Sequence, residues 1–386
     1  MTFASVALGC AKDPDYGPAP PIGTTGTGGT GMPVATVGPP QLGLHVVDNH
    51  IVNQDGNTVT LRGVNRSGTE YQCAHGGTAI FDGPATAASI QAMANWKVNA
   101  VRIPLNEACW LRINGVAVAN SGDNYKQAIV AYVNVLHQFN IVPILELHWV
   151  GPGTSPADRQ QPMPDADHTP TFWADVATTF QNDDGVVFEL YNEPFPDRNR
   201  DSVTGWTCWR DGCTANQAVP TGQAAMTYQA AGMQSLLDAI RATGSKKLVL
   251  LGGLQYSNTL TQWSAYAPTD PMANIAAAWH VYNFNGCVNL GCWDAVPATL
   301  AAAVPIVMTE IGENDCGGSF IESLMEWGDA HGVGYLAWSW NAGGVCTPPT
   351  PPATQGGRPW ALITDYATGT PNGGYAQAFH AHLTAF

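Results

Sequence analysis

Short apolar runs alternate with amphipathic segments from about residue 44 to the end of the chain. The runs are rich in β-branched and aromatic residues and are bounded by Gly, Pro or Asn, which is typical of buried strands. They predict eight strands, over residues 60–65, 99–105, 141–149, 185–193, 247–253, 275–282, 304–312 and 333–341. Eight such strands alternating with helices fit one (β/α)8 barrel, the TIM barrel, better than two domains.

Three segments between the strands carry helical signals. Residues 168–180 have a proline in the expected first turn, and residues 317–332 have Ser319 and Glu322 in capping-box spacing. The third segment, residues 221–244, places apolar side chains near one face, namely Met226, Met233, Leu237 and Ile240. We expect a helix over each segment.

The first 43 residues differ in composition from the rest. Residues 1–10, MTFASVALGC, resemble the end of a signal peptide or a loosely formed lipobox. Residues 11–40 are rich in Pro, Gly and Thr and predict a disordered linker. Residues 44–65 predict a short strand, an Asp-Gly turn and another strand, that is, an N-terminal β-hairpin. We therefore expect a signal remnant and linker over 1–43 and one folded domain over 44–386.

The charge balance limits the classes of partner. Charged residues make up 12% of the chain, and 30 acidic residues face 15 basic ones, for a net charge of -15. Nucleic acid binding needs clustered Lys and Arg, so this balance disfavours nucleic acid and equally an anionic membrane surface. No run approaches the ~20 apolar residues that span a bilayer. The partner is therefore expected to be neutral or cationic.

Nine cysteines in a lysine-poor chain predict an oxidising compartment, with Cys10 left over. The C-x4-C pairs Cys208/Cys213 and Cys287/Cys292 favour local disulfides over zinc, because no second ligand pair accompanies them. The other four cysteines lie in loops at one predicted rim, and neighbouring loops suggest Cys73–Cys109 and Cys316–Cys346. Eight cysteines allow 105 connectivities, so this pairing is a hypothesis. We expect a protein that is secreted, or tethered to the cell surface through its N-terminal segment.

The predicted strand ends carry ionisable, amide and aromatic side chains where small polar residues are more common. In a (β/α)8 barrel, the C-terminal strand ends and the following loops build the active site. The side chains expected to converge there are Arg102, His148, Trp149, Asn192, Glu193, His280, Tyr282, Glu310, Trp338 and Trp340.

Two of these residues form a candidate catalytic pair. Glu193 and Glu310 end strands that lie almost opposite each other in a barrel of eight. At roughly 5 Å apart, two carboxyl groups suit retaining glycoside hydrolysis, and a wider gap suits inversion. One must be protonated and the other ionised, and Arg102 and Tyr282 are the natural donors to the ionised one. Each Glu could instead form a salt bridge, but the shortage of basic residues favours catalysis.

Six motifs along the chain resemble glycoside hydrolase family 5, the cellulase-type retaining barrel enzymes. In chain order they are VRIPL, LELHW, ELYNEP, WHVY, VMTEIG and AWSWN, and the resemblance covers residues 44–386. It implies that Glu193 is the acid/base and Glu310 the nucleophile. It also implies that Asn192 binds the sugar 2-hydroxyl and that Arg102 and Tyr282 hold the nucleophile.

The resemblance implies further substrate contacts. His148 and His280 would contact sugar or the acid/base, and Trp338, with Trp340 as competitor, would form the floor under the sugar. The chain departs from the family pattern at Arg66, where cellulase-like members often have an aromatic residue. Arg66 and His75 would border the site and leave the sugar specificity open.

The remaining acidic residues near the predicted strands are assigned structural or solvated positions. Glu146 and Glu189 would be buried structural carboxylates deeper in the barrel, by the period of two along a strand. Glu70, Glu107 and Glu313 lie in rim loops and are expected to be solvated.

The sequence thus predicts a retaining glycoside hydrolase that acts on oligo- or polysaccharide. An endo-β-1,4-glucanase is the preferred interpretation, and the protein is expected to be a monomer that needs no metal or organic cofactor. A β-mannanase, a xylanase and an exo-acting β-glycosidase are alternatives with the same chemistry. A non-catalytic carbohydrate-binding barrel is a different class, and it would be expected to lack one of the two Glu residues. A phosphate-binding barrel is disfavoured because the loops after the last two strands carry no Lys or Arg.

Overall fold

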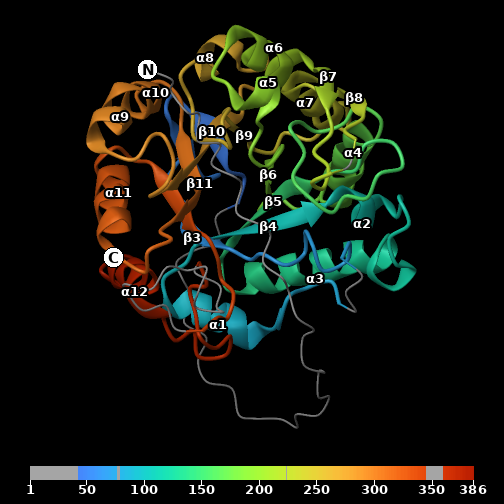
Figure 1. The fold of residues 1–386 in the computed structure, drawn as a ribbon. Helices are drawn as coiled ribbons and strands as arrows, with labels where there is room; N and C mark the ends of the chain where they lie inside the picture. Colours follow the sequence, from blue (N-terminus) through green and yellow to red (C-terminus); the bar gives the residue numbers. More distant parts are fainter. Residues whose placement is uncertain (1–41, 76–78, 223, 345–359) are drawn as a thin grey trace.

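Eight parallel strands form a closed barrel in the computed structural model, which describes residues 42–75, 79–222, 224–344 and 360–386. Their order around the barrel is β10-β11-β12-β3-β4-β5-β6-β9, and helices surround the strands on all sides (Figure 1). The predicted (β/α)8 barrel is therefore confirmed. The expected signal remnant and linker lie outside the described residues.

Each of the eight predicted strands is present. Their side chains are almost entirely buried on both faces, as expected for parallel strands covered by helices. The bounds are β3 Arg62–Asn65, β4 Ala100–Asn106, β5 Val142–Trp149, β6 Val187–Glu189, β9 Val249–Gly252, β10 Ile275–Tyr282, β11 Ile306–Gly312 and β12 Gly334–Ala337.

Strand β6 is shorter than predicted, but its backbone keeps bonding to both neighbours. Leu190 N donates to Leu250 O (3.1 Å), and Asn192 N donates to Leu147 O (2.9 Å). The chain therefore reaches Glu193 still anchored between β5 and β9.

The helices pack outside the barrel. Their bounds are α1 Ala87–Asn95, α2 Glu107–Leu111, α3 Asp123–Gln138, α4 Thr169–Thr179, α5 Pro196–Asn199, α6 Val203–Asp211, α7 Met233–Ala242, α8 Trp263–Tyr266, α9 Leu290–Ala295, α10 Pro297–Ala301, α11 Ser319–Ala330 and α12 Gly373–Thr384, with a 3-10 turn at Val118–Asn120. The helices predicted over residues 168–180 and 317–332 are confirmed as α4 and α11.

The capping box predicted for α11 is wrong. No side chain of the residue preceding the helix caps it, and Ser319 is its first residue. The Glu313 carboxylate takes this role instead, since its Oε1 accepts the Ile321 N–H in the first turn (2.6 Å). The cap thus comes from the end of β11 and not from the helix sequence itself.

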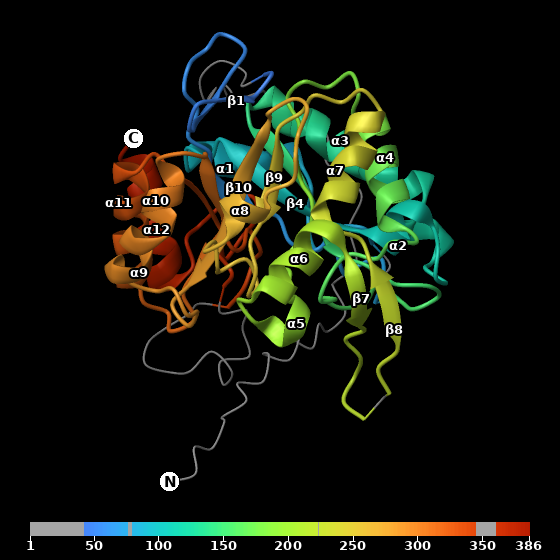
Figure 2. The same cartoon turned by 90° about the horizontal axis from the view of Figure 1, so that it is seen from above.

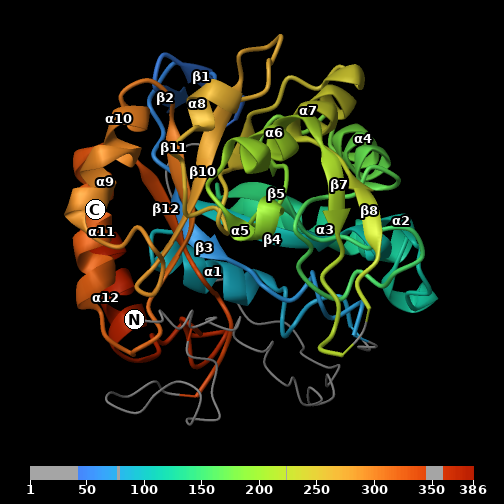
Figure 3. The same cartoon turned by 45° about the horizontal axis from the view of Figure 1, so that its top comes forward.

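Two antiparallel hairpins lie at opposite ends of the barrel (Figure 2). The predicted N-terminal hairpin is confirmed as β1 His45–Val47 and β2 His50–Val52, but its turn is Asp48–Asn49 and not the Asp-Gly pair. At the other end, β7 Cys213–Asn216 pairs with β8 Thr227–Ala230 (Figure 3). The helix predicted over residues 221–244 is therefore wrong in its first half: only Met233–Ala242 is helical, and Met226 is exposed.

Three predicted disulfides are present among the described residues: Cys73–Cys109, Cys208–Cys213 and Cys287–Cys292. Cys316 is also disulfide-bonded, and Cys346, its predicted partner, lies outside the described residues. Within those same residues, every helix is too short or too polar to cross a membrane.

Candidate active site

Strands β4, β10 and β11 place a guanidinium, a phenol and a carboxylate in direct contact. Glu310 lies in β11, Arg102 in β4, and Tyr282 is the last residue of β10. Arg102 Nη1 donates to Glu310 Oε1 (2.7 Å), and Tyr282 OH donates to Glu310 Oε2 (2.6 Å). Both oxygens of Glu310 are therefore held by strong donors, as the sequence led us to expect for an ionised carboxylate.

The charges around Glu310 keep it ionised. Burial by itself would raise the pKa of Glu310, but the positive charges of His280, Arg102 and His148 and the Tyr282 hydrogen bond outweigh it and lower this pKa. A carboxylate with these neighbours is available as a nucleophile throughout the neutral range.

Glu193 lies beside this group, in a different environment. One ligand atom from each of Glu193, His280 and Glu310 lies within 4.8 Å of the others. His280 Nδ1 donates to Glu193 Oε1 (3.0 Å), and the side chain of Glu193 is 24% exposed, against 5% for Glu310. Its backbone has φ of 50°, an uncommon conformation for a residue other than Gly, of the kind found at functional sites.

Arg102 is fixed in the barrel interior by more than Glu310. Its Nε donates to Glu189 Oε2 (2.7 Å), its Nη2 to Asn192 Oδ1 (3.0 Å) and its Nη1 to Asn65 Oδ1 (3.0 Å). Burial would raise the pKa of Glu189, yet Arg102 and His280 lower it to about 2. Glu189 is thus a permanently charged anchor for the arginine.

His280 is a buried cation between three carboxylates. Burial lowers the pKa of His280, but Glu310 and hydrogen bonds with Glu189 and Glu193 outweigh this and raise it to about 9. Its Nε2 donates to Thr309 Oγ1 (3.1 Å), which in turn donates to Glu189 Oε1 (2.9 Å). The imidazolium therefore has a partner on each ring nitrogen.

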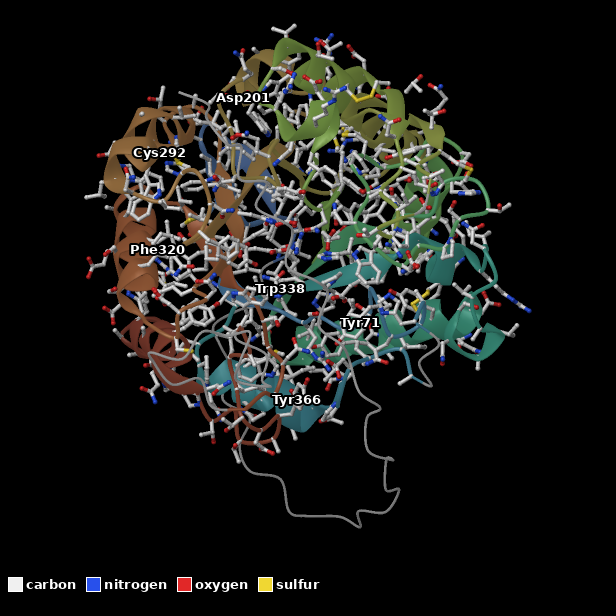
Figure 4. The ribbon with its side chains drawn as sticks, viewed as in Figure 1. Tyr71, Asp201, Cys292, Phe320, Trp338 and Tyr366 are labelled. Carbon is white, nitrogen blue, oxygen red and sulfur yellow. A yellow bond between two sulfur atoms is a disulfide. The ribbon has the colours of Figure 1, made fainter. Side chains whose placement is uncertain are left out.

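His148 and Trp338 form a second side of the site. His148 Nδ1 lies 2.9 Å from Glu146 Oε2, and burial of His148 lowers its pKa less than the Glu146 carboxylate raises it. The half-buried Trp338 ring lies parallel to His148, with 5.5 Å between ring centroids. In Figure 4, Trp338 lies near the centre of the molecule, whereas Asp201, Cys292 and Phe320 lie toward its edge.

Aromatic residues extend this side into the loop after β3. Trp149 lies 6.4 Å from His148 between ring centroids, and the His75 ring lies 5.1 Å from Trp149. Tyr71 also packs on Trp149, with 6.5 Å between ring centroids, and both rings are buried. His75 is exposed, and its Nε2 lies 3.0 Å from Asp158 O.

Comparison with known proteins identifies the family of this chain. Residues 52–344 match the family model "Cellulase (glycosyl hydrolase family 5)". The chain belongs to glycosyl hydrolase family 5. It is therefore a glycoside hydrolase acting on O-glycosidic bonds, and the family that its motifs resemble is confirmed.

Relatives of this family 5 enzyme fall into two groups. A mannan endo-1,4-β-mannosidase from Streptomyces lividans is 24% identical over 316 residues, covering 78% of this chain and 68% of that protein. A β-glucanase from Saccharophagus degradans has a similar fold, with a TM-score of 0.64, 20% identity and coverage of 93% of this chain and 97% of that one; it has also been solved with cellotetraose. A β-mannanase from Streptomyces thermolilacinus, solved with mannohexaose, has a TM-score of 0.57 and 18% identity, with 89% and 94% covered.

Two residues predicted to bind substrate do not face the site of the family 5 enzyme. Arg66 has no exposed surface, donates to the Ser67 and Asp82 carbonyls and lies over the Tyr366 ring. Trp340 is also fully buried, and its Nε1 donates to Ser89 Oγ (3.1 Å) on α1. In this structure both side chains pack within the fold, whereas the Trp338 ring is half-buried.

Three acidic residues expected to be solvated are instead buried. Glu70 accepts from Ser67 Oγ (2.6 Å) and Gly68 N (2.6 Å), and burial raises its pKa. Glu313 caps α11, and Glu107 has no exposed surface at all. The expectation of solvation was wrong because each carboxylate is enclosed with its own donors, and Glu107 lies at the start of α2 and not in a loop.

The sequence-based set missed three residues that hold the site together. Asn65 and Thr309 contact the Arg102 network, and Gln160 Oε1 accepts from Asn192 Nδ2 (2.9 Å). Asn65 is the last residue of β3, so the argument from strand ends that selected the other candidate residues could also have predicted it. Gln160 lies in an irregular segment, where no periodicity signals its position.

Proposed function

We propose that this family 5 enzyme is an endo-β-1,4-glucanase that acts with retention of configuration, with Glu193 as acid/base and Glu310 as nucleophile. The closeness of the two carboxylates, with oxygens no more than 4.8 Å apart, carries this proposal. Carboxyl groups of retaining enzymes lie about 5–5.5 Å apart, and those of inverting enzymes about 6.5–9.5 Å apart. The close approach of one oxygen from each carboxylate therefore supports retention over inversion.

In the first step, a Glu310 oxygen bonds to the anomeric carbon while the bond to the leaving oxygen breaks. Glu193 gives its proton to that oxygen, and a glycosyl-enzyme intermediate forms. In the second step, water gives a proton to Glu193, its oxygen bonds to the anomeric carbon, and the bond to Glu310 breaks. Arg102 and Tyr282 orient Glu310 for attack and receive it again as a carboxylate.

The surrounding residues would bind the sugar. Asn192 is oriented by Arg102 and Gln160 and would donate to the 2-hydroxyl, a contact that strengthens in the transition state. Trp338 would support the sugar ring, and His148 would contact its hydroxyl groups. Trp149 and His75 would extend binding to the next sugar, and His280 positions Glu193.

The choice of glucan rests on the β-glucanase of similar fold, which has been solved with cellotetraose. A β-mannanase is the second candidate, and the Streptomyces lividans relative, which matches 78% of this chain, favours it. Both substrates are chains of β-1,4-linked hexoses that differ in the orientation of the 2-hydroxyl, so Asn192 and His148 would contact the atom that distinguishes them.

Initial rates on soluble β-glucan, carboxymethyl cellulose, mannan and xylan test the substrate. An endo enzyme lowers the viscosity of the polymer well before it releases much reducing sugar. Glucan cleavage above mannan cleavage would support the first candidate, and the reverse order would support the second. Activity confined to small aryl glycosides would overturn endo action.

Two variants test the roles of the carboxylates. Glu310→Gln should abolish turnover of every substrate. Glu193→Gln should cleave polymer about 10²–10⁴-fold more slowly than the parent. On an aryl glycoside whose phenolate leaves without protonation, the rate of the first step should fall much less. Equal losses on both substrates would contradict the acid/base assignment, and inverted anomeric product in NMR would contradict retention.

We further propose that residues 44–386 form one catalytic domain that acts as a monomer. Three disulfides support action outside the cell, where such bonds persist. Sedimentation of the purified chain, with and without substrate, checks the monomer.

A further inference from the structure

A second cluster of ionisable side chains lies apart from the catalytic pair. Glu107 is the first residue of α2, Asp165 lies between β5 and α4, and His168 immediately precedes α4. One ligand atom from each lies within 4.8 Å of the others. We call these three residues the Glu107 cluster. It shares no residue with the group formed by Glu193, His280 and Glu310.

The cluster contains buried polar atoms without partners. Asp165 has no exposed surface, and no donor reaches its Oδ2; the groups within hydrogen-bonding reach of its side chain are two further carboxyls, those of Glu107 and Asp167. His168 Nδ1 is enclosed and equally unpaired. This nitrogen lies 3.6 Å from Asp165 Oδ1 and 3.9 Å from Glu107 Oε2, which is too far for hydrogen bonds. Buried polar atoms normally have partners, so these orphans need an explanation.

The other atoms of the cluster are firmly oriented. Thr169 Oγ1 donates to Glu107 Oε1 (2.6 Å), Gly151 N donates to Glu107 Oε2 (3.2 Å), and His168 N donates to Asp165 Oδ1 (2.8 Å). The far nitrogen of His168, Nε2, lies 3.8 Å from the Asp167 carboxylate. Metal-binding residues are commonly held by such outer hydrogen bonds, including a carboxylate behind the histidine.

The charge of the cluster is also uncompensated. Across the described residues, His168 is the only ion-pair partner of Glu107 and Asp165, and no Lys or Arg reaches either carboxylate. Two buried carboxylates side by side repel each other unless a cation or a shared proton lies between them. The unpaired atoms and the missing positive charge therefore point to the same small volume.

We propose that Glu107, Asp165 and His168 bind a divalent transition-metal ion, with Zn²⁺ as the first choice. Zinc accepts imidazole nitrogen together with carboxylate oxygen, and ligands about 2.1 Å from a tetrahedral ion lie about 3.4 Å apart. The observed 3.6 Å and 3.9 Å separations need only small shifts to match. Calcium prefers oxygen ligands alone, so the histidine argues against it.

The bound ion would stabilise the loops beside Trp149, the part of the site that we propose to bind substrate. Asp165 pairs with Ala230 of β8, so the ion would join α2, the segment before α4 and the β7–β8 hairpin. Glu107 also contacts Gly151, two residues beyond Trp149. The ion would thus stabilise this side of the barrel and take no part in bond cleavage.

Zinc titration of the chelator-treated protein tests the proposal, by calorimetry and by the rise in melting temperature. The titration is performed on Glu310→Gln, because this substitution weakens zinc binding by Glu193, His280 and Glu310. Zinc bound at the Glu107 cluster can then be distinguished from zinc bound at the catalytic group. We expect one site per chain and a melting temperature that increases with zinc concentration, as mass action requires. Ca²⁺ and Mg²⁺ at equal concentration should produce much smaller increases.

Single variants locate the site. His168→Ala and Asp165→Asn, each in the Glu310→Gln background, should weaken zinc binding by about tenfold or more. Asp165→Asn preserves the side-chain shape, so it reports on the site even if the alanine variant folds poorly. The matched control is His137→Ala, which removes a histidine of α3 that is paired with Asp183 at 3.0 Å and does not belong to the Glu107 cluster. It should bind zinc as its parent does.

Either of two results would overturn the proposal: no stoichiometric zinc binding, or binding that both cluster variants leave unchanged. In the first case, Glu107 and Asp165 share a proton, and the cluster is purely structural.

Discussion

The disulfide between Cys73 and Cys109 should stabilise the enzyme more than the one between Cys208 and Cys213. The first closes a sequence separation of 36 residues and the second a separation of 5. By the loop-entropy relation, the longer loop contributes about 4 kcal/mol and the shorter about 2 kcal/mol. Replacing both cysteines of each pair by alanine should therefore lower the free energy of unfolding about twice as much for the first pair.

Equilibrium unfolding in urea without reductant measures both variants beside the parent protein. Cys73→Ala/Cys109→Ala should have the lower midpoint, and Cys208→Ala/Cys213→Ala serves as the matched control. Equal losses, or a larger loss in the control, would refute the entropic argument and point to local packing around the sulfur atoms.

The same variant makes a kinetic prediction, because Cys73–Cys109 joins the loop of Tyr71 and His75 to α2. The groups that hold the carboxylates, Arg102, His280 and Tyr282, lie within β4 and β10, and neither cysteine belongs to these strands. Loss of the bond should therefore raise KM on polymer while kcat changes little. A fall in kcat at constant KM would contradict the idea that this disulfide supports substrate binding and not the catalytic pair.

Three further predictions follow from single contacts. His280→Gln removes a group whose pKa is raised to about 9, so the stability that it contributes is fully present below pH 6.5 and is lost as the pH rises through 9. At pH 6 the free energy of unfolding of the parent should exceed that of the variant by about 3 kcal/mol. Urea unfolding at pH 6 and pH 10 should show that this difference becomes smaller at the higher pH. Trp338→Ala should raise KM about tenfold with a smaller change in kcat, since the exposed ring face supports sugar and not chemistry; steady-state kinetics on soluble β-glucan check it. Burial raises the pKa of Glu313 to about 7, so its contribution to stability is complete below pH 4.5 and lost as the pH rises through 7. Glu313→Gln should therefore gain stability over the parent between pH 5 and pH 8 in thermal unfolding, and a constant difference would contradict this reasoning.

The strands and the catalytic rim could be predicted because both depend on local patterns. A strand covered on both faces is a nearly continuous apolar run, and β4 and β5 illustrate this. Once eight such strands are parallel and closed, polar residues at their ends must lie on one rim. Tyr282 and Glu310 therefore meet at this rim. Arg102 lies earlier in its strand than the sequence predicted, since β4 continues to Asn106, and it reaches Glu310 from inside the barrel although 208 residues separate the two.

The errors share a different physical origin. The segment before α7 has a helical pattern, but Thr227–Ala230 pairs with β7, and the paired residues, from Asn216↔Thr227 to Cys213↔Ala230, lie outside the local window that such a pattern covers. Arg66 and Trp340 were assigned by their position after a strand, yet Arg66 packs against the loop carbonyls of Ser67 and Asp82, and Trp340 packs against α1. Tertiary packing decides these cases, and no local pattern records it.

The division of roles that we propose for the carboxylates rests on their contacts more than on their order along the chain. Glu189 and Glu310 are both held by Arg102, and each has a second donor, Thr309 or Tyr282. Glu193 is the most exposed of the three and has only His280 as its ion-pair partner within the described residues. A carboxyl group that must lose and regain a proton in each cycle needs access to water and a free oxygen, whereas a nucleophile needs fixed donors on a permanently ionised group. The barrel supplies these two environments within 4.8 Å of each other. On this argument, exchanging the roles would require moving Arg102 across the barrel, and exchanging the residues alone would not suffice.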